Sequence, residues 1–254
     1  MSEVLIDGQP LAVGAAVWCS ENQPLRQDAG FVEGTVAGFA ESATAALPDV
    51  LVELHGSGQV VRVQVPHVSL ANARGESGPD DHCGLVHLNE PALLHSTLTR
   101  AAAGNYYTWV GSSQLLSVNP CTPARGAGGS SERSESALMA TFRNRTREVG
   151  GAKPHAYAVA EAACARLHRE RKVAVLVSGE SGAGKTEASR LVVRYLVWRA
   201  AHSGGGDGER RAAQVREGVL ASNTVLESLG NARMLANSNS SRFGKHVLLS
   251  LIHI

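Results

Sequence analysis

The sequence has almost no net charge and no long apolar run, and each shortage excludes a class of protein. Its 24 Lys and Arg residues nearly balance its 23 Asp and Glu residues, which leaves a formal net charge of +1. This balance gives no reason to expect binding to nucleic acid or to an acidic membrane surface. No signal peptide opens the chain, and no apolar run approaches the roughly 18 residues of a membrane-spanning helix. We therefore expect a cytoplasmic protein without direct membrane insertion.

Cysteine is also scarce, and its spacing excludes two further classes. The four cysteines are scattered along the chain, and none forms a C-x-x-C pair: Cys19, Cys83, Cys121 and Cys164. Without paired spacing they indicate neither a disulfide framework nor a zinc site. This cysteine pattern is typical of a protein from a reducing compartment.

The chain does contain one phosphate-binding motif. Residues 179–186 read GESGAGKT and match the pattern G-x-x-x-x-G-K-[ST]. The apolar run at 172–178, KVAVLVS, predicts a buried parallel strand immediately before the motif. Residues 187–201 carry apolar side chains at three- and four-residue spacing, which predicts an amphipathic helix immediately after it. Because strand, glycine loop and helix follow in that order, we expect this stretch to bind a nucleoside triphosphate.

Each residue type in the motif has a physical role. Gly179, Gly182 and Gly184 allow backbone angles that other residues avoid, so that successive N–H groups can turn toward an anion. The start of the helix adds a partial positive charge behind the phosphates. Lys185 is expected at the β- and γ-phosphates, and the Thr186 hydroxyl is expected to ligate Mg²⁺.

At 254 residues the chain is long enough for one large domain or two smaller ones. We predict a disordered terminus over 1–10, then a small antiparallel β-barrel of about five strands over 11–70, then a linker over 71–81. The remaining elements follow from apolar periodicity and turn residues. They are a helix opening near Pro91, two strands within 105–119, helices over 137–147, 155–171 and 209–229, and a strand over 246–254.

Two longer stretches carry a family resemblance. Residues 178–187, SGESGAGKTE, resemble the phosphate loop of myosin motor domains, and residues 237–245, NSNSSRFGK, resemble the switch I segment of that family. LLSVNP at 115–120 resembles its adenine-side strand and turn, and VLESLGNAR at 225–233 resembles its approach to switch I. The resemblance covers roughly residues 11–254 in the order of the family, and the predicted barrel stands where many myosins carry one.

The resemblance implies a set of site residues and two ligands, ATP and Mg²⁺. The ATP-binding residues that it implies are Asn119 and Pro120 beside the adenine, Gly179, Glu180, Ser181, Gly182, Ala183, Gly184, Lys185, Thr186 and Glu187 in the phosphate loop, and Asn237, Ser240 and Ser241 in switch I. Ser181, Lys185, Ser240 and Arg242 are the implied catalytic residues, and Thr186 with Ser241 completes the Mg²⁺ shell. Arg242 is expected to latch onto a glutamate of switch II, because a guanidinium can bind a carboxylate through two parallel hydrogen bonds.

The resemblance also implies a fold and a function. The fold expected over 82–254 is an α/β phosphate-loop NTPase core, with a mostly parallel sheet flanked by helices. Switch II, a D-x-x-G-F-E segment whose strand should pair beside 172–178, is expected downstream of this chain, so the sheet should be incomplete. The implied function is that of the first third of the motor domain of an actin-based ATPase of the cytoskeleton, whose actin-binding regions lie outside these residues.

Two other interpretations compete with the motor hypothesis. The first is a different phosphate-loop protein, either a microtubule motor, which shares the Ser-Ser-Arg switch, or a small-molecule kinase, which shares the phosphate loop. Phe243-Gly244-Lys245 after Arg242 favours myosin, since microtubule motors have Ser-His there, and no segment suggests the acceptor lid of a kinase. The other reading is a truncated, non-motile remnant that binds nucleotide weakly.

Overall fold

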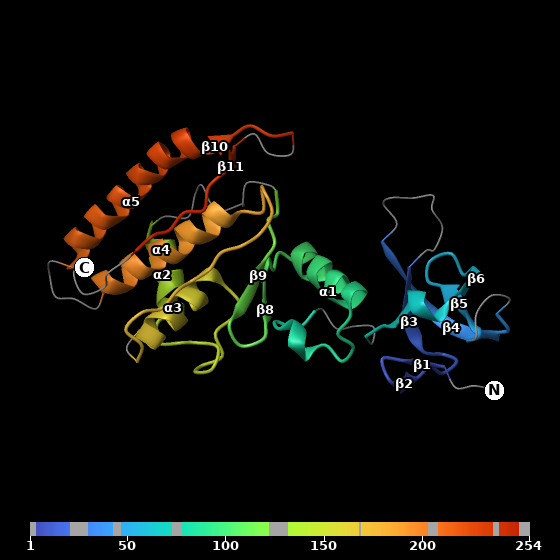
Figure 1. Cartoon of the computed structure of the whole chain (residues 1–254). Coiled ribbons are helices and arrows are strands. Elements are labelled where there is room, and N and C mark those ends of the chain that lie inside the picture. Colours follow the sequence, from blue (N-terminus) through green and yellow to red (C-terminus); the bar gives the residue numbers. More distant parts are fainter. Residues whose placement is uncertain are drawn as a thin grey trace. The chain divides into compact units, whose positions relative to one another are not determined.

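The computed structural model divides the chain into two compact units, Met1–Asn105 and Tyr106–Ile254. It describes residues 4–20, 30–42, 47–72, 78–121, 132–167, 169–202, 208–235 and 239–248. The first unit runs from blue to green in Figure 1, and the second runs from green to red.

The first unit contains a five-stranded antiparallel sheet with the strand order β6-β5-β4-β3-β7 (Figure 1). Its strands are β3 (Ala16–Ser20), β4 (Phe31–Ala40), β5 (Asp49–Leu54), β6 (Val60–Val63) and β7 (Val68–Leu70), with the short 3-10 helix η1 (Val65–His67) before β7. Val50, Val52 and Leu54 alternate along β5 and are buried in one apolar core. The five antiparallel strands predicted within 11–70 are confirmed, and a turn at residues 55–57 leads from β5 toward β6.

The prediction of a disordered terminus is wrong for residues 4–10. β1 (Leu5–Ile6) pairs antiparallel with β2 (Gln9–Pro10) around Asp7 and Gly8, whose φ angles are +53° and +78°. An Asp-Gly pair with two positive φ angles is the sequence that tight hairpin turns favour. Val4 and Ile6 are buried in the core of the larger sheet. Their burial therefore orders a segment whose composition alone indicates a loose end.

One α-helix lies in the described part of the first unit. α1 (Glu90–Ala102) begins after Asn89, whose side chain accepts a hydrogen bond from the backbone N–H of Ala92 at 3.0 Å, and Pro91 lies in the first turn as predicted. Arg100 on α1 is buried and donates to Gly78 O at 3.0 Å and to Asp80 Oδ1 at 2.8 Å. The end of the expected linker, with the 3-10 helix η2 (His82–Gly84) beside it, is thereby fastened to α1.

The described part of the second unit consists of helices and two short antiparallel strand pairs. Its elements are β8 (Tyr107–Val110), β9 (Gln114–Ser117), α2 (Glu132–Phe142), α3 (Ala156–Leu167), α4 (Lys185–Ala201), α5 (Gly208–Gly230), β10 (Asn231–Ala232) and β11 (Ser240–Ser241). α4 packs against both α3 and α5. The hairpin β8-β9, α3, α4 and α5 agree with the predicted elements, whereas α2 lies five residues before its predicted position at 137–147. None of the helices in the described ranges is long and apolar enough to cross a membrane.

The core of the second unit surrounds a buried carboxylate. Glu161 on α3 is 3% exposed and accepts hydrogen bonds from Tyr195 Oη at 2.9 Å, from Arg199 Nε at 3.2 Å and from the backbone N–H of Asn144 at 2.9 Å. Burial, and next the hydrogen bond to Glu161, raises the pKa of Tyr195, so its hydroxyl stays a donor. The ring of Tyr195 stacks on that of Tyr157 with centroids 5.4 Å apart. This polar cluster joins α3, which precedes the phosphate loop in sequence, to α4, which follows the loop.

A second polar cluster fixes α2 and the start of α3. Glu135 of α2 accepts hydrogen bonds from Tyr157 Oη at 2.8 Å and Arg194 Nη1 at 2.7 Å. The backbone N–H of Tyr157 donates to His155 Nδ1 at 3.1 Å. Burial lowers the pKa of His155 to about 4, so the ring is neutral near pH 7 and can accept this bond. These partners explain the early start of α2, because Glu135 precedes the helix that periodicity predicts.

Neither the expected strand at 172–178 nor the mostly parallel sheet around it is formed among the described residues. Every strand pair there is antiparallel, and 172–178 has no regular secondary structure and no paired neighbour among the described residues. Leu176 is 91% exposed and faces no strand partner in the described part. A hollow of about 1370 Å³ lies between this stretch, β9 and α3. An apolar strand needs neighbours for its N–H and C=O groups, and no described segment supplies them.

The C-terminal strand is likewise not formed over residues 246–248, which are irregular and exposed. The rest of that prediction, residues 249–254, lies outside the described residues.

Candidate nucleotide-binding site

The glycine loop leads directly into the N-terminus of α4. Gly179, Gly182 and Gly184 have φ angles of +153°, +85° and +92°, which confirms that the loop uses glycine for left-handed backbone. Gly184 is the residue that caps α4, and the helix begins at Lys185. The first N–H groups of a helix lack intrahelical partners and lie at the positive end of its dipole. The local backbone is therefore suited to an anion, as the motif predicted.

Lys185 folds back over the loop. Its ammonium donates hydrogen bonds to Gly179 O and Glu180 O, both at 2.7 Å. Glu180 O also accepts the N–H of Ala183 at 3.2 Å, which closes the turn. The ammonium is thus held at the loop by two carbonyl dipoles that phosphate oxygens can replace.

Residues 239–245, the described part of the stretch that resembles switch I, are called the switch-like segment below. This segment contacts the phosphate loop through two serines. Ser181 Oγ and Ser240 Oγ lie 2.6 Å apart, and Ser240 is 1% exposed. Ser240 belongs to β11, which pairs with β10 and so fastens the segment to the end of α5. Two predicted site segments far apart in sequence are therefore adjacent in the structure.

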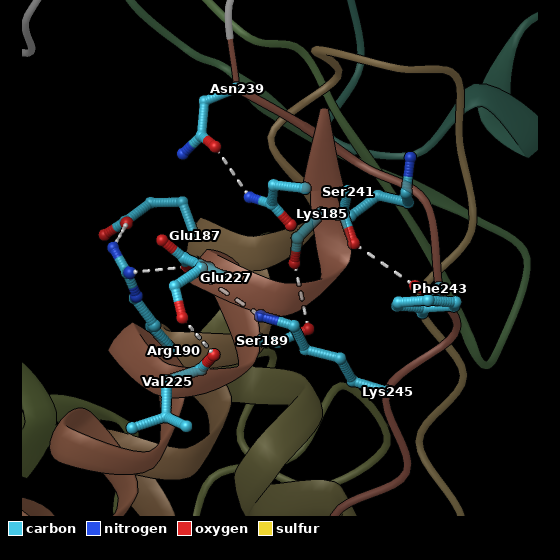
Figure 2. A network of polar contacts seen from close by, with 12 residues as sticks. Lys185, Glu187, Ser189, Arg190, Val225, Glu227, Asn239, Ser241, Phe243 and Lys245 are labelled. Atoms are coloured by element: carbon cyan, nitrogen blue, oxygen red, sulfur yellow. Dashed lines mark hydrogen bonds and ion pairs between the residues drawn. The ribbon is translucent and has the colours of Figure 1, made fainter. Parts of the chain in front are cut away.

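The other predicted residues of this segment have different partners. Ser241 Oγ donates to Phe243 O at 3.2 Å (Figure 2). The backbone N–H of Arg242 donates to Gly230 O at 2.8 Å, and its exposed guanidinium contacts Met234 Sδ at 2.8 Å. Arg242 therefore faces a thioether here, whereas the resemblance implies a carboxylate partner. Asn237 lies outside the described residues.

Asn119 lies against the phosphate loop. Its side-chain amide donates to Gly182 O at 2.7 Å, and its carbonyl oxygen accepts the backbone N–H of Cys121 at 3.0 Å. The resemblance implies a place beside the adenine for Asn119 and Pro120, and it says nothing of a bond to the loop. No local pattern signals this bond, because the two partners are 63 positions apart.

The remaining predicted residues lie in the first turn of α4. Thr186 is half-buried there, and Glu187 is exposed and pairs with Arg190 Nη1 at 3.4 Å (Figure 2). No three His, Cys, Asp or Glu side chains gather around a metal position in the part of the chain that the structure describes. Magnesium in nucleotide sites commonly relies on one or two protein oxygens together with phosphate oxygens and water. The hydroxyls of Thr186 and Ser241 are groups of that kind.

Sequence reasoning missed one charged residue near the site. Glu227 of α5 forms ion pairs with Arg190 of α4 and with Lys245, which follows the Ser-Ser-Arg turn (Figure 2). Residue 227 lies inside the quoted stretch VLESLGNAR, but nothing in that text indicates its partners.

The comparisons with known proteins agree with the geometry. The family model of the myosin head (motor domain) matches residues 79–251. Myosin-6 of Arabidopsis thaliana is 39% identical over 172 residues, which are 67% of this chain and 10% of that protein. Myosin-8 of the same plant is 34% identical over 238 residues, or 93% of this chain and 14% of that protein. Protein OPAQUE1 of Zea mays is 38% identical over 170 residues, covering 66% of this chain and 10% of that protein.

This chain thus spans only a small part of the length of the relatives that it matches. The matched residues contain both the phosphate loop and the Ser-Ser-Arg segment. The match to the myosin head model, rather than these two motifs, separates the chain from the microtubule motors and kinases. The chain therefore belongs to the myosin head (motor domain) family.

Proposed function

We propose that this chain is the nucleotide-binding part of an actin-based motor, which binds Mg-ATP and, in the full-length protein, couples ATP hydrolysis to movement along actin filaments. Membership of the family implies nucleotide binding in general. The observation that carries the specific proposal is the hydroxyl contact of Ser181 with Ser240, which joins the phosphate loop to the switch-like segment. A phosphate group bound at the loop would lie within reach of both segments.

The proposed chemistry is in-line attack of water on the γ-phosphate, with positioning and charge stabilisation as the main contributions of the protein. The backbone N–H groups of 182–186 and Lys185 hold the β- and γ-phosphates, and Lys185 exchanges its two carbonyl partners for phosphate oxygens. Ser181 and Ser240 orient the attacking water. Thr186 and Ser241 would hold Mg²⁺, which supplies positive charge to the phosphates when it is bound.

The other proposed roles depend on groups at the rim of the site. Glu180, Ala183 and Glu187 complete the loop around the phosphates, and Pro120 borders the adenine. Asn237 would hydrogen-bond the phosphates. Arg242 would leave Met234 for a switch II glutamate supplied from outside these residues, which links closure of the switch to hydrolysis.

The same proposal includes the domain plan. The five-stranded antiparallel sheet supports a small barrel of the myosin N-terminal type at 11–70. A linker at 71–81 and the N-terminal part of the motor domain at 82–254 would follow, and the latter would form an incomplete phosphate-loop NTPase core. We place the full-length protein on the cytoskeleton, with actin filaments as its partner.

Calorimetric titration of the purified chain with ATP, with and without Mg²⁺, tests the proposal. We expect saturable binding that Mg²⁺ strengthens. In a separate phosphate-release assay, actin filaments should not accelerate the reaction, because Arg242 contacts Met234 and no carboxylate among the described residues. Absence of ATP binding under both conditions would contradict the nucleotide site. Actin-stimulated phosphate release from this chain alone would contradict the claim that the coupling elements lie outside it.

Replacing Asn119 with alanine should weaken ATP and inorganic tripolyphosphate equally, by about fivefold, which corresponds to one lost hydrogen bond. The reason is that its amide holds the Gly182 carbonyl and thus the shape of the phosphate loop. Competition binding of the two ligands against a fluorescent ATP analogue measures both affinities.

The matched control is Cys121→Ser, which keeps the backbone N–H that donates to Asn119. It should leave both affinities unchanged. A loss of ATP affinity in Asn119→Ala with unchanged tripolyphosphate affinity would mean that Asn119 acts on the adenine alone.

A further inference from the structure

Glu227 is the centre of a charge cluster that joins three segments of the second unit. Its Oε1 atom lies 3.2 Å from Arg190 Nη2 and 3.7 Å from Lys245 Nζ (Figure 2). Arg190 lies on α4, Glu227 on α5, and Lys245 on the segment that follows β11. One carboxylate therefore links both helices to the switch-like segment.

The two cations lie on the two segments that form the candidate site. Arg190 lies on the same helix as Lys185 and Thr186, little more than one turn further on. Lys245 follows Ser240 and Ser241 on a short, otherwise exposed stretch. Glu227 thus connects the two segments that meet at Ser181 and Ser240, by a route separate from that hydroxyl contact.

Glu227 interacts with both cations at a site that is only partly exposed to solvent. Its side chain and that of Lys245 are each 24% exposed, so water screens their attraction less than that of a fully exposed pair. Arg190 Nε is buried without a hydrogen-bond partner among the described residues, so the guanidinium depends on the contacts of its Nη atoms with Glu187 and Glu227. Without the charge of Glu227, the cluster keeps two cations and one exposed carboxylate.

Backbone and ring contacts one turn later on α5 act on the same stretch. Gly230 O accepts the N–H of Arg242, and a Cβ on Gly230 would lie 2.7 Å from Phe243 Cδ2. The end of α5 therefore fixes Arg242 and Phe243 closely, while Glu227 fixes Lys245 beyond them. Together these contacts set where the Ser-Ser-Arg turn lies.

We propose that Glu227 is a positioning residue, which holds the segment 239–248 at the phosphate loop through Lys245 and Arg190. The effect of Glu227 on the affinity for Mg-ATP rests on the proposed function, because only a correctly placed Ser241 hydroxyl can add to the Mg²⁺ shell. Its effect on the segment itself needs no ligand. These two consequences can be measured separately.

The first measurement is hydrogen exchange in the ligand-free chain. In Glu227→Gln, which keeps the shape of the side chain but removes its charge, the amides of 240–243 should exchange about threefold to tenfold faster, as expected for loss of a partly buried ion pair. Lys245→Met should give the same increase, and the double variant should exceed neither single variant. Glu170→Gln, which removes an exposed carboxylate paired with Arg166, is the matched control and should leave these amides unchanged.

The second measurement is ATP affinity with Mg²⁺ and with a chelator. Glu227→Gln should reduce the ratio of the two affinities about threefold to tenfold, with little change in the chelator value. Equal losses under both conditions would reduce Glu227 to a general structural role, and unchanged exchange at 240–243 would overturn the proposal outright. If Glu227→Gln fails to fold, Lys245→Met decides, because its side chain lies on the peripheral segment. Failure of the wild-type chain to bind ATP would contradict the proposed function, while the exchange result would still decide the positioning role.

Discussion

Replacing Lys185 with methionine should weaken ATP binding on the order of a hundredfold, because charge-assisted hydrogen bonds to phosphate are among the strongest polar contacts in proteins. Methionine keeps the length of the side chain but carries no positive charge and donates no hydrogen bond. The loss should also appear with tripolyphosphate, since Lys185 lies over the loop and is expected at phosphate rather than at the base. Calorimetric titration of both ligands measures it.

The ligand-free loop should change in the same variant. Gly179 O and Glu180 O would lose the ammonium that they share, so the amides of the loop should exchange faster with solvent. Lys172→Met, at an exposed lysine before the loop, is the matched control and should alter neither affinity nor exchange. ATP affinity within twofold of wild type in Lys185→Met would remove the phosphate role from Lys185.

Replacing Glu161 with alanine should destabilise the second unit by about 3–5 kcal/mol, the range for removing one partner of a buried ion pair. Glu161 is buried, and its carboxylate accepts from a tyrosine hydroxyl, an arginine and a backbone N–H. Tyr195 Oη, Arg199 Nε and the backbone N–H of Asn144 would each lose this acceptor. Urea unfolding followed by circular dichroism gives the change in the free energy of unfolding.

Two further variants separate charge from shape at this site. Glu161→Gln keeps one acceptor oxygen and should lose less stability than Glu161→Ala. Glu170→Gln on the exposed ion pair with Arg166 should stay within about 0.5 kcal/mol of wild type, as surface substitutions usually do. A loss in Glu161→Ala as small as that of Glu170→Gln would show that Arg199 and Tyr195 find other acceptors.

Elements with a local signal could be predicted from the sequence. The apolar spacing after the phosphate loop gives α4 within two residues of its start, and Pro91 marks the first turn of α1. The positive φ angles of the three loop glycines follow from the motif alone. In each case the information lies within a few residues of the element itself.

Elements that depend on distant partners could not be predicted in the same way. The stretch 172–178 has the composition of a buried strand, but a strand forms only beside another strand, and none of the described segments pairs with it. α2 starts before its apolar period does, because Glu135 bonds to Tyr157 and Arg194. The composition of a segment can be read from that segment alone, whereas strand pairing and side-chain hydrogen bonds depend on two segments.

The candidate site also has contacts that the sequence predicts and contacts that it does not. The motif predicts the loop and Lys185, and the family resemblance implies catalytic roles for Ser181 and Ser240, whose hydroxyls lie together in the structure. The bond from Asn119 to Gly182 and the link from Glu227 to Lys245 have no counterpart in periodicity or motif. Both are single side-chain contacts between segments that are distant in sequence and that only the folded chain brings together.

The unpaired stretch 172–178 also bears on the order in which the protein folds during synthesis. The five-stranded sheet completes its hydrogen bonding within residues 16–70, so this part can fold as soon as it leaves the ribosome. The apolar stretch at 172–178 emerges later and finds no strand partner among the described residues. Until later residues or another molecule pair with it, Val175 and Leu176 stay in water. Chaperones that bind extended apolar segments of nascent chains would therefore find their target immediately before the phosphate loop.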